Sequence, residues 1–473
     1  MHDDGLQWGG RFATPPDPAL LAFGSSLEED LVLAPFDVRC SRAHVTALES
    51  GRIIATASAA ALRAALAIVE AEIDDGTFAA SARKTNAEDV HGAIDARVRE
   101  LAPEAGESLH AGRSRNDQVA TTLVLYARDR AERGAALSAG IARAALAQAR
   151  EALRDEILLA ATTHWQPAQP ILLAFWLEAV AESFARAAAR FDRVAADACA
   201  ASPLGSGACS GSTLPLDRAA AAKELGFAAP TRNALDAIGE RDLALDLLHA
   251  LTRALGAASR PSEEIVLWCT PAFGYARLAD AASTGSSLMP QKRNPDPFEL
   301  VRAHAAAANG ALAAALGTVS GIALSYHRDL QETKATVIRA VERGLGALDA
   351  FGRAFAYVHW NGAAMSARAG DGYTVATDLA DALILRGVTA RHAHTLVGNS
   401  VREAEREGRA LQPSDLATLA KAAGLTLPLD APLGARASVR AKRTVGSTSP
   451  EAVASAISEL ETVLEARERK VHA

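Results

Sequence analysis

A polar loop between two helical patterns carries the residue types best suited to chemistry. Residues 285–295 read GSSLMPQKRNP, so the stretch opens with a glycine and two hydroxyls and ends with Lys292 and Asn294 before a new helical segment. The glycine favours a mobile loop, and the prolines keep most of it out of a helix. Amides at a helix N-terminus favour anions. By composition alone the stretch also fits an ordinary surface loop, but its parts suit a reaction in which negative charge develops.

Three further loops present polar side chains between helical patterns. Residues 112–118 read GRSRNDQ, where two arginines, a serine and an asparagine can bind a carboxylate. Residues 162–170 read TTHWQPAQP, in which Thr163 and two glutamines can orient His164 or a carboxylate. The Gly- and Ser-rich loop at 202–212 can cradle an anion or move, but it lacks the residue order of a phosphate-binding loop.

The reaction that fits these parts is β-elimination from a succinyl group. A base removes a Cβ proton next to a carboxylate, and the resulting dianionic intermediate needs cations and hydrogen-bond donors already in place. Lys292, Asn294 and loop amides can supply them. Ser286 becomes a base only where such groups stabilise its alkoxide, and an acid must protonate the leaving nitrogen. Glu299, five residues after Asn294, could pair with His164, raise its basicity and fix its tautomer.

Long helices must position these loops. Helical patterns are expected over about 37–73, 118–160, 168–199, 240–258, from Asn294 onward, from Asp329 to Val358, over 376–387 and 390–408, and as short, proline-interrupted helices from Pro413 to Ala473. Patterns longer than 25 residues favour a coiled-coil-like bundle, and alanine-rich faces allow close packing. The sequence predicts an all-α fold with negligible sheet and three domains, at 1–116, 117–366 and 367–473. His91 is expected to be a half-buried packing residue.

Composition favours a helical protein with reduced thiols. The 473 residues are rich in alanine and only 5% aromatic, which favours helix over sheet. The net charge of −7 argues against a nucleic-acid binder, which needs a basic face. Four distant cysteines fit reduced thiols better than a disulfide or zinc framework: Cys40, Cys199, Cys209 and Cys269. The sequence shows neither a signal-peptide core nor a bilayer-length apolar run, so we expect a soluble, cytoplasmic protein.

Several motifs together resemble one enzyme family. The 285–295 loop matches the signature loop of the fumarase/aspartase superfamily at every defining position. Further stretches resemble the argininosuccinate lyase family: WGGRF at 8–12, GRSRNDQ at 112–118, THWQPAQP at 163–170, LDA at 235–237 with Arg241-Asp242, YHRDLQETK at 326–334 and ATDLAD at 376–381. The resemblance covers essentially the whole chain. It implies a three-domain, fumarase/aspartase-like homotetramer that shares a central helical bundle and takes each active site from three chains, without metal or organic cofactor.

The resemblance also implies a reaction and roles for individual residues. The reaction is the reversible cleavage of argininosuccinate to arginine and fumarate, a step of arginine biosynthesis. Ser286 would take the Cβ proton, while Lys292 and Asn294 hold the reacting carboxylate. His164, paired with Glu299, is a candidate for proton transfer. The positions that match substrate contacts, or belong to the same walls, are Ser26, Arg113, Ser114, Arg115, Asn116, Thr163, Tyr326, Gln331 and Lys334.

Some pocket-wall positions depart from the family pattern. His327 stands where asparagine is usual, Pro167 where arginine is usual, and Gly239-Glu240 where Ser-Asp is common. The catalytic set is intact, so elimination chemistry is expected even where the amine half of the substrate differs. Two alternatives therefore stay open. One is a divergent lyase that releases fumarate from another N-substituted aspartate. The other is a catalytically silent structural protein on the same scaffold, as lens crystallins derived from this family are.

Overall fold

The structure, a computed structural model, describes residue 14 and residues 17–426 and 429–471. The WGGRF motif at 8–12 therefore lies outside the described residues. The chain divides into two compact units, each assembled from three separate stretches. Unit 1 is formed by Met1–Ala136, Ala187–Gly256 and Ala303–Ala347. Unit 2 is formed by Leu137–Arg186, Ala257–Arg302 and Leu348–Ala473.

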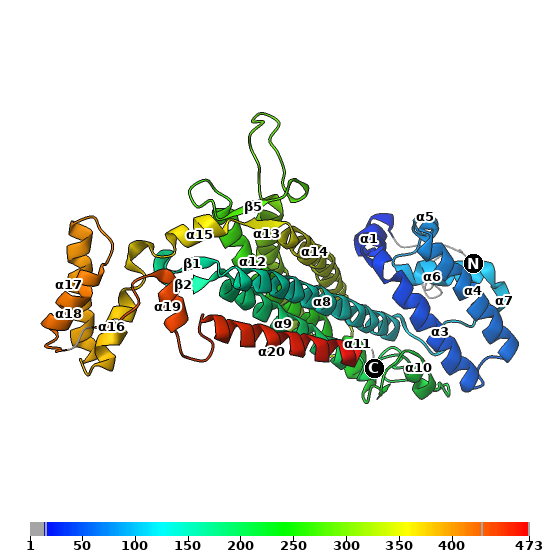
Figure 1. Ribbon diagram of the computed structural model, residues 1–473. Helices are drawn as coiled ribbons and strands as arrows, with labels where there is room; N and C mark the ends of the chain where they lie inside the picture. The colour runs from blue at the N-terminus through cyan, green and yellow to red at the C-terminus, as the bar shows by residue number, and fades with distance from the viewer. Residues whose placement is uncertain (1–13, 15–16, 427–428, 472–473) are drawn as a thin grey trace. The chain divides into compact units, whose positions relative to one another are not determined.

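Five long helices make up most of the middle of the chain. They are α8 (Arg115–Arg154), α9 (Leu173–Asp197), α12 (Asp242–Trp268), α13 (Asp296–Ser320) and α14 (Leu330–Ala356) (Figure 1). The sequence predicted a long helix in each of these regions. The predicted all-α fold is thus confirmed, with only short strands among the described residues.

Small and aromatic residues explain why these helices pack closely. In unit 1, Gly134 of α8 faces the ring of Phe191 of α9, and a Cβ at this glycine would lie 2.7 Å from ring carbons. In unit 2, the ring of Phe351 stacks on Phe184 and Phe355 at centroid distances of 5.3 and 5.5 Å. All three of these rings are fully buried. Burying one such side chain contributes about 1.5–3 kcal/mol, so the helices are held mainly by their apolar faces.

The remaining elements of unit 1 are shorter than these five helices. They are α1 (Pro18–Gly24), α2 (Leu27–Asp30), η1 (Leu31–Leu33), α3 (Ala34–Ser50), α4 (Thr56–Asp74), α5 (Thr77–Ala82), α6 (Val90–Leu101), α7 (Pro103–Gly106), β3 (Ala201–Ser202), α10 (Arg218–Glu224), β4 (Ala229–Pro230) and α11 (Ala234–Gly239). Strands β3 and β4 pair in parallel over two residues each. The helical pattern expected over 37–73 is present as α3 and α4, separated after Ser50.

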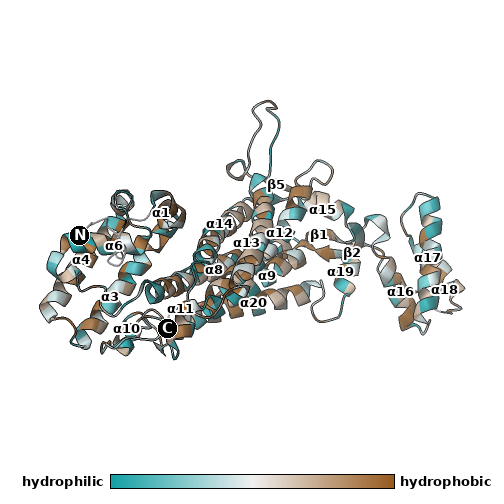
Figure 2. Ribbon diagram, turned by 180° about the vertical axis from the view of Figure 1, so that it is seen from behind, coloured by the Kyte–Doolittle hydropathy of each residue, from teal (hydrophilic) through white to brown (hydrophobic). Residues whose placement is uncertain are grey.

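Unit 2 carries two antiparallel strand pairs and the C-terminal helices. Its elements are β1 (Leu158–Thr163), β2 (Gln166–Leu172), β5 (Ala276–Leu278), η2 (Asp280–Ala282), β6 (Val358–Trp360), α15 (Gly362–Arg368), η3 (Asp371–Tyr373), α16 (Ala376–Leu385), α17 (Ala390–Arg406), α18 (Pro413–Ala422), α19 (Ala435–Ala441) and α20 (Pro450–Val471). Strands β1 and β2 form a hairpin, and β5 pairs with β6. A small apolar core joins α16, α17 and α18 through Leu379, Leu383, Ala393, Val397 and Leu419. Hydrophilic and hydrophobic residues alternate along α17 in Figure 2, as expected of a helix with one buried face.

Two predictions about secondary structure are wrong. The helices expected to run to residue 160 and to start at residue 168 instead end at Arg154 and begin at Leu173, and the β1–β2 hairpin lies between them. Pro167 and Pro170, only three residues apart, disfavour a helix where β2 lies. The C-terminal part is also not made of short helices alone. Helix α20 has 22 residues, starts at Pro450 and contains no further proline, so nothing interrupts it.

Candidate active site

The signature loop is closed at its base by backbone pairing in unit 2. Thr284 and Asn294 form an antiparallel bridge, in which the Asn294 N–H donates to the Thr284 carbonyl at 2.9 Å. The Asn294 side-chain amide also donates to Thr284 Oγ1 and to the Gly285 carbonyl, both at 3.3 Å. The residues between these two positions form the long hairpin-like loop beside β5 in Figure 1. Asn294, expected to hold a substrate carboxylate, thus also holds the base of the loop.

The turn at the start of this loop gives the Ser286 hydroxyl two hydrogen-bond donors. The backbone N–H groups of Leu288 and Met289 donate to Ser286 Oγ at 3.3 and 3.1 Å. Hydrogen bonds directed at an oxygen stabilise negative charge on it, because they favour the charged form over the neutral one. Ser286 itself is half-buried, while Leu288 is 83% exposed. The loop therefore supplies donors to the one oxygen that the sequence identified as a base.

Lys292 and Glu299 lie on either side of the start of α13, and both are exposed. The Lys292 backbone N–H donates to the Met289 carbonyl at 3.1 Å, and the residue is exposed to solvent. Glu299 lies in the first turn of α13, where the helix dipole favours a carboxylate. Neighbouring Arg293 is tied down instead: it pairs with Asp280 at 2.5 Å and donates to the Leu278 carbonyl at 3.1 Å.

The β1–β2 hairpin places His164 in an uncommon backbone conformation. Thr163 pairs with Gln166, so His164 and Trp165 are the two residues of the turn, with φ angles of +53° and +60°. Two-residue hairpin turns favour positive φ, but asparagine and glycine usually occupy them. A bulky residue at positive φ costs free energy and is found mostly where function requires it. Thr163, His164 and Trp165 are all exposed, so the turn presents its side chains outward.

The expected His164–Glu299 pair is not made within one chain. Both residues belong to unit 2, and the described part of the chain shows neither a hydrogen bond nor an ion pair between them. The pairing thus stays a prediction, and in the family pattern it would draw on more than one chain.

In unit 1, Asp117 joins the 112–118 segment to the Gly- and Ser-rich loop. Its carboxylate accepts backbone N–H groups of Ser114, Gly205 and Gly207, each at 2.9 Å. Burial raises the pKa of Asp117 to about 6, although these three hydrogen bonds and Arg113 oppose the rise. The sequence analysis did not single out Asp117, although it lies inside the GRSRNDQ motif. It fixes the backbone that carries the expected substrate contacts.

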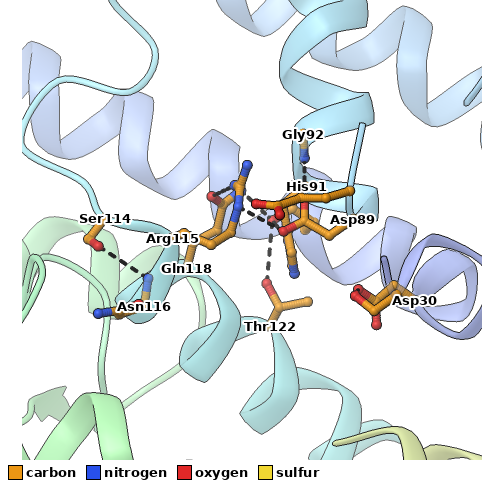
Figure 3. A network of polar contacts seen from close by, with 12 residues as sticks. Asp30, Asp89, His91, Gly92, Ser114, Arg115, Asn116, Gln118 and Thr122 are labelled. Carbon is orange, nitrogen blue, oxygen red and sulfur yellow. Dashed lines mark hydrogen bonds and ion pairs between the residues drawn. The ribbon is translucent and has the colours of Figure 1, made fainter. Parts of the chain in front are cut away.

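Both arginines of this segment already have partners. Arg113 is buried and donates to Ser41 Oγ of α3 at 2.9 Å. Arg115 pairs with Asp89 at 3.0 Å and donates to the Gln118 side chain. Figure 3 shows Arg115 within the buried polar network that also includes Asp89 and Gln118. The two guanidinium groups were expected to bind a carboxylate directly. They also hold in place the 112–118 segment, which is called the wall below.

Asn116 and Ser114 complete the same wall. The Asn116 side-chain amide donates to the Ala208 carbonyl at 3.0 Å, and its backbone N–H donates to Ser114 Oγ at 3.3 Å. Both side chains are only partly buried, so they keep surface for a ligand. In this wall, Asn116 and Ser114 remain more open to solvent than the buried Arg113 and Asp117.

A buried carboxylate organises Ser26 and Lys334. Lys334 Nζ lies 2.7 Å from Asp30 Oδ1, with side-chain exposures of 5% and 0%, and Ser26 Oγ donates to Asp30 Oδ2 at 2.6 Å. No motif in the sequence points to Asp30. Because its charge balances Lys334, this lysine is a positioned donor rather than an unpaired cation.

Gln331 and Tyr326 lie at the start of α14 and in the loop before it. Gln331 Nε2 donates to the Gly24 carbonyl at 3.1 Å, so it holds the end of α1. Burial raises the pKa of Tyr326, while Arg328 and Arg241 nearby act to lower it. Tyr326 is half-buried and thus keeps a phenol hydroxyl at the edge of the surface, next to the exposed His327.

His91 is not the half-buried packing residue that was expected. Its side chain is 0% exposed, and its Nδ1 lies 2.8 Å from Asp37 Oδ1, which also accepts a hydrogen bond from Gln118 Nε2 at 2.7 Å. Burial alone would raise the pKa of Asp37, but His91, Arg113 and Gln118 outweigh it and lower the pKa to about 2. No local sequence pattern indicates this pair, because Asp37 lies 54 residues before His91.

The described residues contain neither a candidate membrane-spanning helix nor a candidate metal site. No helix in the described ranges is both long and apolar enough to cross a bilayer. In the same part of the chain, no three or more His, Cys, Asp or Glu side chains are arranged to hold a metal ion.

Comparisons with known proteins identify the family. A family model described as "Lyase" matches residues 10–310, and one described as "Argininosuccinate lyase C-terminal" matches residues 373–440. The chain is 39% identical to an argininosuccinate lyase of Thermus thermophilus over 94% of this chain and 96% of that protein. It is 44% identical to an argininosuccinate lyase of Anaeromyxobacter sp. over 83% of each chain. The chain belongs to the argininosuccinate lyase family.

Solved structures of lower identity share the fold of this argininosuccinate lyase family member. EDDS lyase in complex with formate is 24% identical, with a TM-score of 0.79 over 96% of this chain and 90% of that one. A class II fumarase from Schistosoma mansoni is 16% identical, with a TM-score of 0.67 over 84% of this chain and 88% of that one. The fumarase/aspartase-like helical fold expected from the signature loop is thus confirmed.

Proposed function

We propose that this chain catalyses the reversible β-elimination of argininosuccinate to fumarate and arginine. Its membership of the argininosuccinate lyase family supports the reaction. The observation within the chain that best supports it is the pair of backbone N–H donors to Ser286 Oγ. A serine hydroxyl is a weak base, and donors fixed on its oxygen are what the removal of a Cβ proton requires.

In the proposed reaction, Ser286 takes the proton from the carbon next to the reacting carboxylate. The electron pair moves into that carboxylate, and the resulting dianionic intermediate needs cations and donors. Lys292 is exposed at the same loop and brings a cation. The Asn294 amide, which donates to Thr284 Oγ1 and to the Gly285 carbonyl at the loop base, is proposed to exchange one of these bonds for the carboxylate. The carbon–nitrogen bond then breaks, and a proton on the leaving nitrogen completes the release of fumarate and amine.

Thr163 and His164 are proposed to lie at the fumarate side, with His164 as a proton carrier. The turn holds His164 at positive φ with its side chain in solvent, so a second group must fix its tautomer. Glu299, exposed in the first turn of α13, is the proposed partner. Because these two do not pair within one chain, the proposal requires a neighbouring subunit to bring them together.

The substrate is proposed to contact side chains of unit 1 that the structure holds in place. Ser114 and Asn116 remain partly open on the wall fixed by Asp117, and Tyr326 offers a phenol hydroxyl. Ser26 and Lys334 are positioned by Asp30. The residues proposed to bind substrate are thus Ser26, Arg113, Ser114, Arg115, Asn116, Thr163, Tyr326, Gln331 and Lys334.

The assembly is proposed to be a cytoplasmic homotetramer that needs no metal or organic cofactor. Its domains are proposed at 1–116, 117–366 and 367–473. The separate family match over 373–440 supports a boundary near residue 366. Light scattering tests the assembly directly, because a monomer in solution would contradict shared active sites.

A side-by-side rate comparison tests the substrate. Fumarate release, followed by absorbance, would be measured with argininosuccinate, adenylosuccinate and aspartate. We expect a clear preference for argininosuccinate, since aspartate leaves the groups on the amine side without partners and forfeits their contribution to transition-state binding. Equal or greater activity on another of these substrates would contradict the assignment.

A second candidate is a lyase that releases fumarate from another N-substituted aspartate. His327 favours it, because this exposed side chain lies next to Tyr326 in the segment proposed to meet the amine. Replacing His327 with asparagine, the usual residue, distinguishes the two. For an argininosuccinate lyase, kcat/KM on argininosuccinate should stay within a few-fold, whereas a marked rise would show that the native pocket is adapted to another amine.

A further inference from the structure

Unit 2 contains a cavity of about 370 Å³, and its lining includes none of the proposed catalytic or substrate-binding residues. One wall is the β1–β2 hairpin, and the others are α9, the end of α12 and the segment around α15. A volume of this size is typical of sites for small molecules. The side chains that give the cavity its character are Trp165, Trp176, Glu264, Trp268, Phe273 and Tyr275.

Five of the residues that line the cavity are aromatic. Trp176 and Trp268 lie with ring centroids 4.8 Å apart, and Trp268 lies 6.3 Å from Tyr275. Phe273 meets Tyr275 edge-on at 5.6 Å. Trp268 and Tyr275 are almost fully buried, whereas Trp165 is 54% exposed at the rim. Aromatic faces attract cations through the ring quadrupole, most strongly where water is excluded.

A carboxylate without an ion-pair partner lies among these rings. Glu264 and Trp268 are four residues apart on α12, so both point from the same helix face. The Trp176 indole N–H donates to Glu264 Oε2 at 2.9 Å. Within the part of the chain that the structure describes, this is the one hydrogen bond to the Glu264 carboxylate, and no Lys, Arg or His lies within ion-pair distance.

The charged groups near Glu264 leave its negative charge without a neutralising ion pair. Burial raises the pKa of Glu264, while the hydrogen bond from Trp176 and the more distant Arg260 act to lower it. The cavity also contains Asp371, which is exposed, and Arg368, which donates to the Ala272 carbonyl at 2.8 Å. The lining thus holds two carboxylates, and its one guanidinium, that of Arg368, is already bonded to backbone. A half-buried carboxylate of this kind is stabilised by a cationic ligand.

We propose that this cavity is a binding site for a small organic cation bearing a guanidinium or alkylammonium group, held by Glu264 and the rings of Trp176 and Trp268. The cation would form a charge-assisted hydrogen bond with Glu264 and rest against the indole faces. The proposal does not depend on the proposed lyase reaction, because none of its three main residues belongs to the proposed catalytic set.

The test uses the full-length protein and its own fluorescence. Trp165, Trp176 and Trp268 are three of the five tryptophans in the chain, so a ligand in the cavity should change the intrinsic emission. Butylguanidinium would be titrated at constant ionic strength, beside butylurea, a neutral molecule of the same shape. We expect a saturable change with butylguanidinium and none with butylurea over the same range. An equal response to both would overturn the proposal.

Variants locate the binding. Glu264→Gln should weaken butylguanidinium binding by about tenfold or more, because a charge-assisted bond is lost. Glu263→Gln is the matched control: it removes the same charge one residue away, outside the cavity, where the side chain pairs with Arg302. Unchanged affinity in Glu264→Gln would place the cation elsewhere and contradict the proposal.

Circular dichroism would show whether Glu264→Gln alters the fold. A second variant tests the cavity in that case. Phe273→Leu thins the aromatic wall at a half-buried loop position and leaves Glu264 in place. It should weaken binding several-fold, since the aromatic contribution falls. Wild-type affinity in Phe273→Leu, together with a loss of fold in Glu264→Gln, would show that the cation does not bind in this aromatic cavity and would overturn the proposal.

Discussion

The signature loop of unit 2 and the 112–118 segment of unit 1 are built in opposite ways. The loop is held at its base by Thr284 and Asn294, and beyond that its side chains, including Leu288, are mostly exposed. The 112–118 segment is tied at nearly every residue, above all through the buried Asp117 and Arg113. Few contacts allow the loop to move, whereas many contacts fix the wall.

This difference separates the groups that react from the groups that position. Ser286 and Lys292 would need to approach a substrate and leave it again, which a weakly held loop permits. Ser114 and Asn116 would need to keep one geometry, which the wall enforces. Substitutions in the loop should therefore lower kcat and leave the free energy of unfolding almost unchanged. Substitutions in the wall should mainly lower the free energy of unfolding.

The largest expected effect is on rate, from Ser286→Ala. Removing a proton-transfer group typically lowers kcat by about 10²–10⁴-fold. The free energy of unfolding should change by less than about 0.5 kcal/mol, because truncating a loop side chain leaves no core cavity. Fumarate release and chemical denaturation would measure the two. Near-normal turnover would show that another residue, with His164 the first candidate, is the base.

The next effect is on stability, from Lys334→Met. This change leaves the Asp30 carboxylate buried without its cation, which typically costs about 3–5 kcal/mol. Urea unfolding of the variant against the wild type gives the value. A loss below about 1 kcal/mol would mean that Asp30 is satisfied in another way, and that Lys334 is less a part of the fixed wall than the geometry indicates.

Asp117→Ala tests the wall at its centre. The change leaves the N–H groups of Ser114, Gly205 and Gly207 without their acceptor, at an expected cost of about 2–4 kcal/mol. Asp381→Ala is the matched control, because Asp381 is exposed on α16. The melting temperatures of both variants would be measured by thermal unfolding. Equal melting temperatures for Asp117→Ala and Asp381→Ala would refute the role of Asp117.

The pH dependence of stability gives a smaller, signed effect at the same residue. Burial raises the pKa of Asp117 in the folded chain to about 6, from an ordinary value of 3.8. Between these values the folded state binds a proton that the unfolded state has released. The contribution of this group to stability therefore falls as the pH rises from about 4 to about 6. Asp117→Asn cannot titrate, so the stability of wild type minus variant should decline over this window, and a flat difference would contradict the shift.

The smallest effect on stability is expected from Lys292→Met. This variant makes the same side-chain change as Lys334→Met, but in the loop. Lys292 is exposed and its side chain has no partner among the described residues, so stability should stay within about 0.5 kcal/mol. Its kcat should still fall, since a cation is lost from the reacting region. A stability loss as large as that of Lys334→Met would erase the distinction between loop and wall.

The sequence predicted the helices well because their apolar residues repeat with the helical period over many turns. It did not predict the β1–β2 hairpin, because the turn uses His164 and Trp165 instead of the usual asparagine and glycine. It also expected short helices where α20 runs for 22 residues. Short strands and turns depend on a few residues, so a single unusual pair removes the signal.

The motifs predicted the residues of the candidate site. They did not predict the ion-pair and hydrogen-bond partners that position those residues. Lys334 meets Asp30 across 304 positions of sequence, and His91 meets Asp37 across 54. No local spacing indicates such a pair. Asp117 was the exception, since it lies inside the motif it supports, and a buried acid between two loop segments could have been suspected there.

One measurement tests the separation of reaction from positioning most directly. Argininosuccinate would be titrated into the Ser286→Ala variant by calorimetry, and fumarate would be determined in the same sample. We expect saturable binding, with fumarate formed at least about 10²-fold more slowly than by the wild type. Fumarate at a near-wild-type rate, or an intact fold that no longer binds argininosuccinate, would contradict it.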